Sequence, residues 1–442
     1  MTVDDSAGQL AGMTLEELRE EHRHWLFDDF LPFMDRYVVD HEYGGFMCTV
    51  DRDGTRISGD KRTWYEGRGI WVYSFLFNRI DPNPAYLDIA RRAVEFIMRQ
   101  DPLGARLLPV RYSREGDPLD VGDPIFYGDV FVANGLQEFA RTPGNEDYWD
   151  VARRIVLKCV DIYDNRPGYA DIPAGPSRLP RPVGPARGRG GAPAGGGNAA
   201  AGEAQEQVVP GVERPRICGH WMVLLNCVQQ MLEVRPDADL QAIARRSVDA
   251  VMEHHFNPAW DLISEYAHHD LSRIDSERGQ ICTGHGPETL WMILYEAVRT
   301  GDAELFERAA GHLRRSAEIF WDDVYGGMLA GLDHVDLNIW NTGQKSLWLQ
   351  QEMLIGMLSV IEHTGAAWAR AWYERLHAYV MDKFPLRQYG FPLWAAYADR
   401  KITFVRHYNR CEHFHHPRYL MLNLLALDRM RERRGELSRV FA

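Results

Sequence analysis

The segment Asp40-His-Glu-Tyr-Gly-Gly-Phe-Met-Cys-Thr-Val-Asp-Arg-Asp-Gly54 places two glycine-containing turns around a short alternating run, a pattern that predicts a small β-hairpin. It follows a segment from Thr14 to about Val39 whose apolar residues recur at helical spacing. A similar pattern returns in Asp322-Asp-Val-Tyr-Gly-Gly-Met-Leu-Ala-Gly-Leu-Asp333, and weaker versions lie at Asn257 to Asp275 and Tyr389 to Thr403. The chain therefore repeats a unit of helices and hairpins.

Helical periodicity accounts for most of the remaining chain. The predicted helices are 14–39, 61–79, 83–101, 127–141, 146–165, 218–234, 238–255, 287–299, 302–319, 343–363, 366–382 and 415–429. We therefore predict an all-α fold, an (α/α)6 barrel of about twelve helices with short β-hairpins at one end. An open solenoid is the alternative, but it would leave an apolar concave face and usually has tighter sequence periodicity.

Residues 173–215 interrupt the helical pattern. They are rich in Pro, Gly and Arg and carry almost no apolar residues. Because helices of the same character resume afterwards, we predict a disordered insertion inside a single domain that spans residues 1–442, and not a linker between two domains.

The composition excludes several classes of partner. The net charge of −13 and the pI near 5.7 argue against binding to nucleic acid or to an anionic membrane. The N-terminus has no signal-peptide pattern, and no run approaches the roughly 18 apolar residues of a membrane span. The six cysteines form no CxxC motif. We expect a soluble cytoplasmic protein with reduced thiols.

Two histidines precede prolines that open apolar helices, in Gly284-His285-Gly-Pro-Glu288 and in Phe414-His415-His416-Pro417-Arg418. Proline is tolerated in the first helical turn, so both imidazoles are predicted at helix N-termini. There the helix dipole would lower an imidazole pKa and favour the neutral base. Glu288 and Arg418 are first-turn candidates to partner His285 and His415. Ordinary packing is the alternative for each histidine alone, whereas the pair favours acid/base catalysis.

A stripe on the predicted helix 61–79 carries Trp64, Arg68 and Trp71, since residues four and seven apart share a face. Indole rings can cover the C–H faces of a sugar while a guanidinium reaches its oxygens. An arginine that extends past two core tryptophans is the plainer interpretation, and periodicity alone favours it.

The predicted helix 343–363 brings Lys345, Trp348 and Glu352 inward by the same spacing. Glu352 lies among apolar residues, so it is either a buried carboxylate with a function or part of an exposed polar strip. Spacing leaves these two interpretations open.

A metal site is one interpretation of His407, His413, His415 and His416, which cluster in the sequence. Metal ligands need to share one face, and the adjacent His415 and His416 point apart on a helix. We therefore predict no metal site. The sequence also lacks a phosphate-binding glycine loop and a GxSxG motif, and no cofactor is expected.

Six segments, taken in order, resemble the N-acylglucosamine 2-epimerase family, also called renin-binding proteins, to which cellobiose 2-epimerases and aldose-ketose isomerases are related. The resemblance covers nearly the whole chain outside residues 173–215. The matching segments are Lys61-Arg-Thr-Trp64-Tyr-Glu66-Gly67-Arg68-Gly-Ile-Trp71, Phe126-Tyr-Gly-Asp129-Val-Phe131 with Glu138, Trp221-Met-Val-Leu-Leu-Asn226, Gly284-His285-Gly-Pro-Glu288, Lys345-Ser-Leu-Trp348-Leu-Gln-Gln-Glu352 and Phe414-His415-His416-Pro417-Arg418.

The resemblance implies an (α/α)6 barrel with a deep sugar pocket and a sugar 2-epimerase activity. His285 and His415 would be the acid/base pair, and Arg68, Glu288, Glu352 and Arg418 would bind and polarise the open-chain sugar. The helical stripes add Trp64, Trp71, Lys345 and Trp348 to the predicted substrate-binding residues. Proton abstraction at carbon 2 of an open-chain aldose would give an enediolate. Inversion removes a proton from one face and returns it to the other, so two opposed imidazoles suffice without metal or nicotinamide. The arginines would stabilise the enediolate oxygens.

Several positions depart from the family pattern. Glu66 stands where the family has Gln, which would add a carboxylate beside Arg68. Cys411 is displaced by two positions, and His413 occupies its place. Cellobiose epimerases carry a ring-opening His where this chain has Val223, although His220 lies one turn earlier. These departures put the identity of the substrate in doubt more than the fold.

Other activities stay open from the sequence alone. An aldose-ketose isomerase would use the same site with proton transfer on one face. A glycoside hydrolase on the same barrel would use paired carboxylates such as Glu352 and Asp129, and a catalytically silent relative would bind a sugar or a protein. We expect a small-molecule sugar as the partner. The sequence leaves open which sugar, whether a nucleotide activates the protein, and whether it forms a homodimer.

Overall fold

The computed structural model describes residues 9–51, 53–120, 126–165, 215–274, 281–332, 344–386, 395–397, 400–401 and 413–441. Residues 166–214 lie outside this set, and with them nearly all of the predicted insertion at 173–215. His407 and Cys411 also lie outside the described residues.

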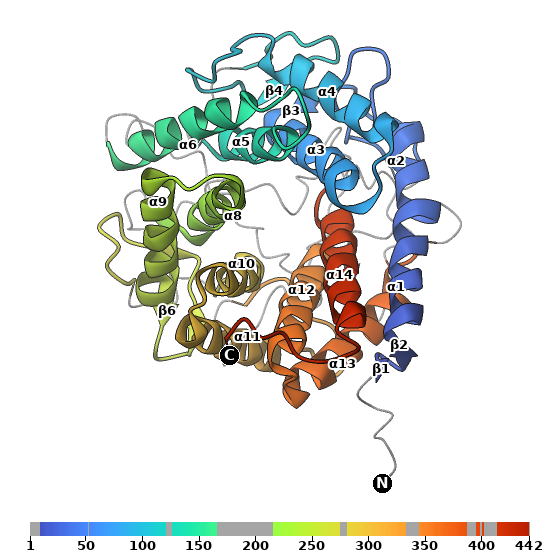
Figure 1. Cartoon of the computed structure of the whole chain (residues 1–442), viewed down its shortest axis with the longest axis vertical. Helices are drawn as coiled ribbons and strands as arrows, with labels where there is room; N and C mark the ends of the chain where they lie inside the picture. The colour runs from blue at the N-terminus through green and yellow to red at the C-terminus, as the bar shows by residue number, and fades with distance from the viewer. Residues whose placement is uncertain are drawn as a thin grey trace, which may run out of the picture.

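A ring of six helices surrounds the centre of the molecule, and a second helix covers each of them from outside (Figure 1). The inner helices are α3 (Thr63–Phe75), α5 (Tyr127–Phe139), α8 (Cys218–Val234), α10 (His285–Thr300), α12 (Leu347–Thr364) and α14 (His415–Glu432). Their outer partners, in the same order, are α4 (Pro84–Met98), α6 (Tyr148–Asp164), α9 (Ala238–Asp249), α11 (Ala303–Phe320), α13 (Ala367–Lys383) and α1 (Leu15–His24). The predicted (α/α)6 barrel is confirmed.

Three helices continue through π-helical stretches. Helix α1 runs through η2 (Trp25–Phe30) into α2 (Leu31–Tyr37), α3 ends in η3 (Leu76–Ile80), and α9 ends in η4 (Ala250–His255). These stretches lie within the predicted helical segments 14–39, 61–79 and 238–255, apart from the last residue of η3. The period of apolar residues therefore located the helices but did not reveal their π-helical turns.

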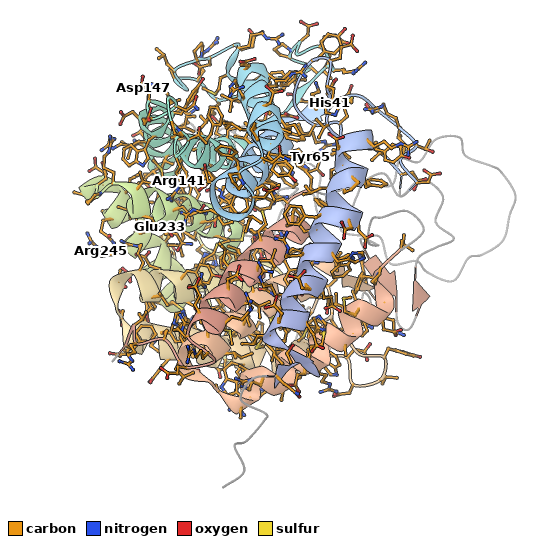
Figure 2. All side chains as sticks on the ribbon, turned by 45° about the vertical axis from the view of Figure 1, so that its right-hand side comes forward. His41, Tyr65, Arg141, Asp147, Glu233 and Arg245 are labelled. Atoms are coloured by element: carbon orange, nitrogen blue, oxygen red, sulfur yellow. The ribbon has the colours of Figure 1, made fainter. Side chains whose placement is uncertain are left out.

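The two rings differ in the way their sequences are buried. Every residue of α5 is buried, because an inner helix contacts neighbours on all sides. Helix α11 instead buries one stripe and exposes its charged face, as expected for an outer helix. Figure 2 shows Arg141 and Glu233 lying together near the ends of α5 and α8, where Arg141 Nη2 is 3.1 Å from Glu233 Oε2.

Short strands precede several inner helices. Strand β3 (Lys61–Arg62) pairs with β4 (Arg111–Tyr112), β5 (Arg216–Ile217) pairs with β8 (Tyr266–Ala267), and β9 (Gln344–Ser346) pairs with β10 (Ala395–Tyr397), which also pairs with β11 (Arg400–Lys401). The remaining pairs are β6 (Phe256–Asn257) with β7 (Leu262–Ile263) and β1 (Gln9–Leu10) with β2 (Met13–Thr14). Since β3, β5 and β9 run directly into α3, α8 and α12, the strands mark the end of the barrel where inner helices begin.

The sequence echo between residues 40–54 and 322–333 is a structural repeat. Each segment turns through two glycines with positive φ, and a buried lysine from the following strand clamps its first aspartate. Lys61 Nζ lies 3.0 Å from Asp40 Oδ2, and Lys345 Nζ lies 2.5 Å from Asp322 Oδ2. Single bridges, Val39 to Phe46 and Trp321 to Met328, close the two turns.

The same two turns share a second clamp. The Phe46 amide donates to Glu66 Oε1 at 3.0 Å, and the Met328 amide donates to Gln350 Oε1 at 2.7 Å. Glu66 and Gln350 each follow their clamp lysine by five residues, so they are equivalent positions of the repeat.

The helices were also compared with the length and hydropathy that a membrane span requires. Among the residues that the structure describes, none of them meets both requirements.

Candidate functional site

His285 lies in the first turn of α10, at the barrel end where the inner helices begin. Its Nδ1 is 2.8 Å from Glu265 Oε1, on the chain segment between β7 and β8. A Cβ on Gly219 of α8 would lie 2.8 Å from this Nδ1, so the glycine leaves the room that the imidazole occupies. The His285 side chain is 24% exposed, which leaves part of the ring accessible from the barrel interior or from solvent.

The protonation of His285 differs from the prediction made from the helix dipole. Burial alone would lower the pKa of the imidazole, but the charge of Glu265 and its hydrogen bond outweigh burial and raise the pKa to about 9. Because an adjacent carboxylate acts at contact distance, it dominates the weaker field of the helix end. The expected neutral imidazole is therefore wrong for His285, which carries a proton at neutral pH.

His415 belongs to a buried cluster of four charged or titratable groups. Its Nδ1 lies 2.7 Å from Glu352 Oε1, and Arg418 Nη2 lies 2.6 Å from the same oxygen. Arg418 Nη2 also lies 2.5 Å from Glu288 Oε1 and 3.1 Å from His415 Nδ1. Glu288 therefore partners Arg418, whereas the sequence assigned it to His285 as its first-turn neighbour.

Glu352 has a third hydrogen bond, from Trp291 Nε1 at 2.6 Å to its Oε2. The side chain is fully buried, so the open question between a buried and an exposed carboxylate is settled for the buried one. Arg418 is held only through Nη2 among the described residues, and its Nε and Nη1 atoms are buried without a hydrogen-bond partner there. These contacts make Glu352 a residue that positions His415.

Trp348 joins the two imidazoles. Its indole ring lies 6.1 Å from the His285 ring and 5.0 Å from the His415 ring, measured between centroids. Gly284 permits this position, because a Cβ there would lie 2.1 Å from the indole. The structure therefore brings both predicted catalytic histidines against one half-buried aromatic side chain.

Arg68 lies in a cage of aromatic rings. Its guanidinium carbon is 4.7 Å from the Trp64 ring, 4.3 Å from the Phe131 ring and 4.7 Å from the Phe414 ring. Arg418 contacts the same Phe414 ring at 4.3 Å. Phe414 thus connects the two arginines, a role that the sequence did not indicate.

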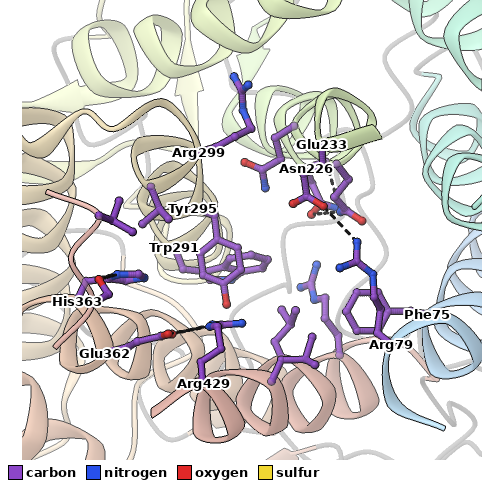
Figure 3. A pocket seen from close by; sticks show the side chains of 18 of the residues that line it. Phe75, Arg79, Asn226, Glu233, Trp291, Tyr295, Arg299, Glu362, His363 and Arg429 are labelled. Carbon is purple, nitrogen blue, oxygen red and sulfur yellow. Dashed lines mark hydrogen bonds and ion pairs between the residues drawn. The ribbon is translucent and has the colours of Figure 1, made fainter. Parts of the chain in front are cut away.

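Trp71 lies about two helical turns after Trp64 on α3. It lines a cavity of about 410 Å³ between the C-terminal parts of the inner helices, and Figure 3 shows the residues around this space. Its Nε1 donates to Gln230 Oε1 at 2.7 Å. Arg79, Arg299 and Arg429 from three inner helices or their extensions surround the same cavity. The predicted stripe therefore divides between two levels of the barrel.

Lys345 lies apart from this group. The predicted helix 343–363 begins at Leu347, because Gln344–Ser346 pair as strand β9. On the strand, the Lys345 side chain is fully buried and clamps Asp322. The structure thus places Lys345 in the hairpin clamp, where its ammonium group is already paired.

The carboxylates of the hydrolase alternative have separate partners. Asp129 Oδ1 lies 2.6 Å from Lys158 Nζ on outer helix α6, and its Oδ2 accepts from the Leu108 amide at 3.2 Å. Glu352 is bound instead to His415, Arg418 and Trp291. Each of the two carboxylates is therefore paired with a cation, Asp129 with Lys158 and Glu352 with Arg418.

The clustered histidines point to different surroundings. His413 Nε2 donates to the Tyr65 carbonyl at 2.7 Å, and its Nδ1 lies 3.1 Å from Cys48 Sγ. His416 Nδ1 lies 2.6 Å from Gln351 Nε2. His415 is bound to Glu352. Each of the three imidazoles is therefore bonded to a different residue.

The departures from the family pattern also have structural positions. His220 packs against Phe126, Tyr127 and Tyr163, and burial lowers its pKa to about 3. Val223 is buried in the same helix. Glu66 holds the Phe46 amide in the first hairpin clamp, so it faces the hairpin and does not add a carboxylate at Arg68.

The chain is similar in sequence to known sugar epimerases. A family model described as N-acylglucosamine 2-epimerase (GlcNAc 2-epimerase) matches residues 220–417, which include both histidines. N-acylglucosamine 2-epimerase of Bos taurus is 26% identical over 408 residues, covering 87% of this chain and 86% of the relative. The Homo sapiens N-acylglucosamine 2-epimerase is 24% identical over 415 residues, covering 90% and 88%.

Solved structures show the same fold at lower identity. Cellobiose 2-epimerase from Bacillus thermoamylovorans B4167 matches with a TM-score of 0.72 at 17% identity, covering 93% of this chain and 99% of that one. A D-mannose isomerase matches with a TM-score of 0.66 at 13% identity, covering 94% and 97%. The chain is therefore similar in sequence to N-acylglucosamine 2-epimerases, and it shares the fold of cellobiose 2-epimerases.

Proposed function

We propose that the chain is a sugar 2-epimerase that inverts carbon 2 of an open-chain aldose through an enediolate. The observation that carries the proposal is the contact of Trp348 with both His285 and His415, each of which is bonded through Nδ1 to a carboxylate. Inversion needs an acid and a base that reach carbon 2 from different sides. Two imidazoles from α10 and α14, held independently, supply this pair.

The two imidazoles have different electrostatic surroundings, which assigns their resting roles. Glu265 stabilises the protonated form of His285, so His285 is the proposed proton donor. Next to His415, the guanidinium of Arg418 offsets the charge of Glu352, so His415 is the proposed base. In the reverse reaction the roles exchange, because one forward turnover leaves His415 protonated and His285 neutral.

The remaining residues support charge and position. Arg68, enclosed by Trp64, Phe131 and Phe414, is the proposed donor to the developing enediolate oxygen. Trp348 is the proposed apolar surface for the sugar carbons. Glu288, Glu352 and Arg418 act through the cluster that holds His415. Lys345 and Trp71 have structural contacts that already account for them.

Proton exchange with solvent tests the activity directly. A panel of free aldoses and N-acetylhexosamines is incubated with the protein in deuterated water and followed by proton NMR. We expect deuterium at carbon 2 together with the 2-epimer. A ketose product would instead identify an aldose-ketose isomerase, and release of a reducing end from an oligosaccharide without exchange would identify a hydrolase.

Variants of the two imidazoles test the site. We expect His285→Ala and His415→Ala each to abolish exchange while circular dichroism shows an unchanged helical content. Undiminished exchange in either variant would remove that residue from the mechanism.

A further inference from the structure

Glu265, Cys282 and His285 form a compact group of metal-type ligands beside the proposed catalytic imidazole. One ligand atom from each residue lies within 4.8 Å of the others. Glu265 Oε1 is 2.8 Å from His285 Nδ1, and its Oε2 is 2.5 Å from Cys282 Sγ. A tetrahedral zinc ion places its ligand atoms about 3.3–3.8 Å apart, since its bonds measure about 2.0–2.3 Å. Small shifts would therefore accommodate an ion.

A second group of the same kind shows why this one is distinctive. Glu288, Glu352 and His415 also lie within 4.8 Å of one another. Arg418 Nη2 occupies that centre, at 2.5 Å from Glu288 and 2.6 Å from Glu352. Within the described ranges, Glu265 has no ion pair with an arginine or lysine, so its cationic partner is the imidazole alone.

The ligands are held by fixed elements of the fold. The Cys282 amide donates to the Ile263 carbonyl at 2.9 Å, and Ser264 bridges to Ile281. These contacts fix the segment that contains Glu265 against Cys282, which lies three residues before α10. The Cys218 thiol at the start of α8 is hydrogen-bonded to the Cys282 thiol, which ties this segment to α8.

The donor set selects a class of ion. A thiolate, an imidazole nitrogen and a carboxylate oxygen together suit zinc and similar borderline cations, and they suit calcium or magnesium poorly. We propose that Glu265, Cys282 and His285 form a site for a zinc-class divalent cation, and that the bound cation inhibits the protein reversibly. The inhibitory part rests on the function proposed above, whereas the binding part does not.

Inhibition follows from the nitrogen that the ion would use. His285 Nδ1 faces Glu265 and is the atom available to the cation. Coordination releases the Nδ1 proton and the Cys282 thiol proton to solvent. The neutral imidazole then holds its remaining proton on Nε2 and is no longer an imidazolium. The ion also replaces the hydrogen bond from Nδ1 to Glu265 that holds the ring of the proposed donor.

Cobalt(II) and zinc(II) titrations of the full chain test the site. Bound Co²⁺ is expected to show a thiolate charge-transfer band and tetrahedral d–d bands, both displaced by one equivalent of Zn²⁺. Competition with a chromophoric chelator gives the zinc affinity. Cys282→Ser should remove the charge-transfer band and weaken zinc binding by at least about 10-fold. Glu265→Gln should weaken zinc binding while it keeps the thiolate band.

Cys227→Ser is the matched control, because Cys227 of α8 is also buried and its thiol is hydrogen-bonded to Met231. It should bind both ions as the unmodified chain does. A band that is absent from the unmodified chain, or that persists in Cys282→Ser with a helical circular dichroism spectrum, overturns the site. A band that is lost equally in Cys227→Ser also overturns it.

The activity arm separates this proposal from the proposed function. Zinc should suppress deuterium exchange in the unmodified chain, and a chelator should restore it. Exchange that continues with zinc bound overturns the inhibitory role. If the cobalt band behaves as expected but no sugar exchanges deuterium under any condition, the proposed function fails and the cation site stands.

Discussion

Glu265 Oε1 lies 2.8 Å from His285 Nδ1, which gives the imidazole a partner from a different structural element. The other imidazole, His415, has Glu352 as its carboxylate, but there Arg418 shares the carboxylate. The two halves of the proposed acid/base pair therefore differ by one guanidinium. This asymmetry is the basis for assigning His285 as the proposed proton donor and His415 as the proposed base.

Glu265→Gln tests the first half of this arrangement. The amide keeps the shape of the side chain but removes the charge that raises the pKa of His285 to about 9. We expect kcat to fall by about 100-fold with a smaller change in KM, because orientation and charge of an acid/base group contribute roughly this factor. In chelator-treated buffer, the limb of the pH–rate profile that belongs to His285 should move to lower pH.

Glu296→Gln is the control for this experiment. Glu296 is also a buried carboxylate of α10, and it is bonded to Arg299 on the same helix. We expect the kcat and the pH–rate profile of the Glu296→Gln variant to match those of the unmodified chain. If Glu265→Gln loses activity without any displacement of the profile, Glu265 has a structural role only.

Glu352→Gln and Glu362→Gln form a matched pair on α12. Both carboxylates are buried and both bind arginine, Glu352 through Arg418 and Glu362 through Arg429 and Arg433. Each substitution weakens charge-assisted hydrogen bonds, so both variants should lose about 1–3 kcal/mol of unfolding free energy. Only Glu352 contacts an imidazole of the proposed site, so only its variant should lose exchange activity, by about 100-fold.

Urea denaturation and deuterium exchange on the same preparations measure the two effects. Comparable losses of activity in both variants would mean that activity follows stability. The positioning role of Glu352 would then be lost.

Gly219→Ala tests the space beside His285. Alanine favours a helix over glycine by about 1 kcal/mol, yet its Cβ would lie 2.8 Å from His285 Nδ1 and 2.9 Å from Cε1. The ring must shift, which disturbs the contact of Nδ1 with Glu265, so we expect exchange activity to fall by about 10-fold or more. Gly311→Ala on α11 has nothing within 4 Å of the added Cβ. It should raise the melting temperature and leave exchange unchanged.

Equal activity of Gly219→Ala and Gly311→Ala would show that the His285 ring tolerates displacement. A crystal structure of Gly219→Ala with the imidazole still bonded to Glu265 would give the same answer. Either result contradicts the close fit inferred from the geometry.

The helices could be predicted from the sequence because each inner and outer helix has its own apolar period and is bounded by Pro or Gly. The errors lie at starts such as 343, where strand pairing of Gln344–Ser346 with β10 takes residues from the helix. Lys345 was assigned to the site through that error. Strand pairing depends on residues distant in sequence, so helical spacing could not reveal it.

The site was predictable where local sequence specifies it. The prolines behind His285 and His415 fix both imidazoles in a first helical turn, and the structure keeps them there. Glu265 was missed because no periodic pattern marks the short segment between β7 and β8. Its contact with His285 depends on the pairing of Cys282 with Ile263, which is a tertiary feature. The helix-dipole argument, which uses local sequence alone, likewise predicted a lowered pKa for His285, whereas Glu265 raises it.

Glu66 provides a prediction about stability and pH. Burial raises its pKa to about 8, and the charge of Lys61 offsets only part of this effect. Since the unfolded carboxyl has a pKa near 4.5, the folded chain binds one more proton between these values. The stabilising contribution is therefore complete below about pH 4.5 and is lost as pH rises towards about 8.

Glu66→Gln should remove this loss. An amide can still accept from the Phe46 amide, as Gln350 does from Met328 in the second hairpin. We expect the variant to unfold at higher urea concentration than the unmodified chain at about pH 8, and the difference should shrink towards about pH 5. The exposed Glu436, substituted by Gln, should show no such dependence. A stability difference that stays constant across this range would mean that Glu66 is already ionised in the folded chain, and that Lys61 outweighs burial.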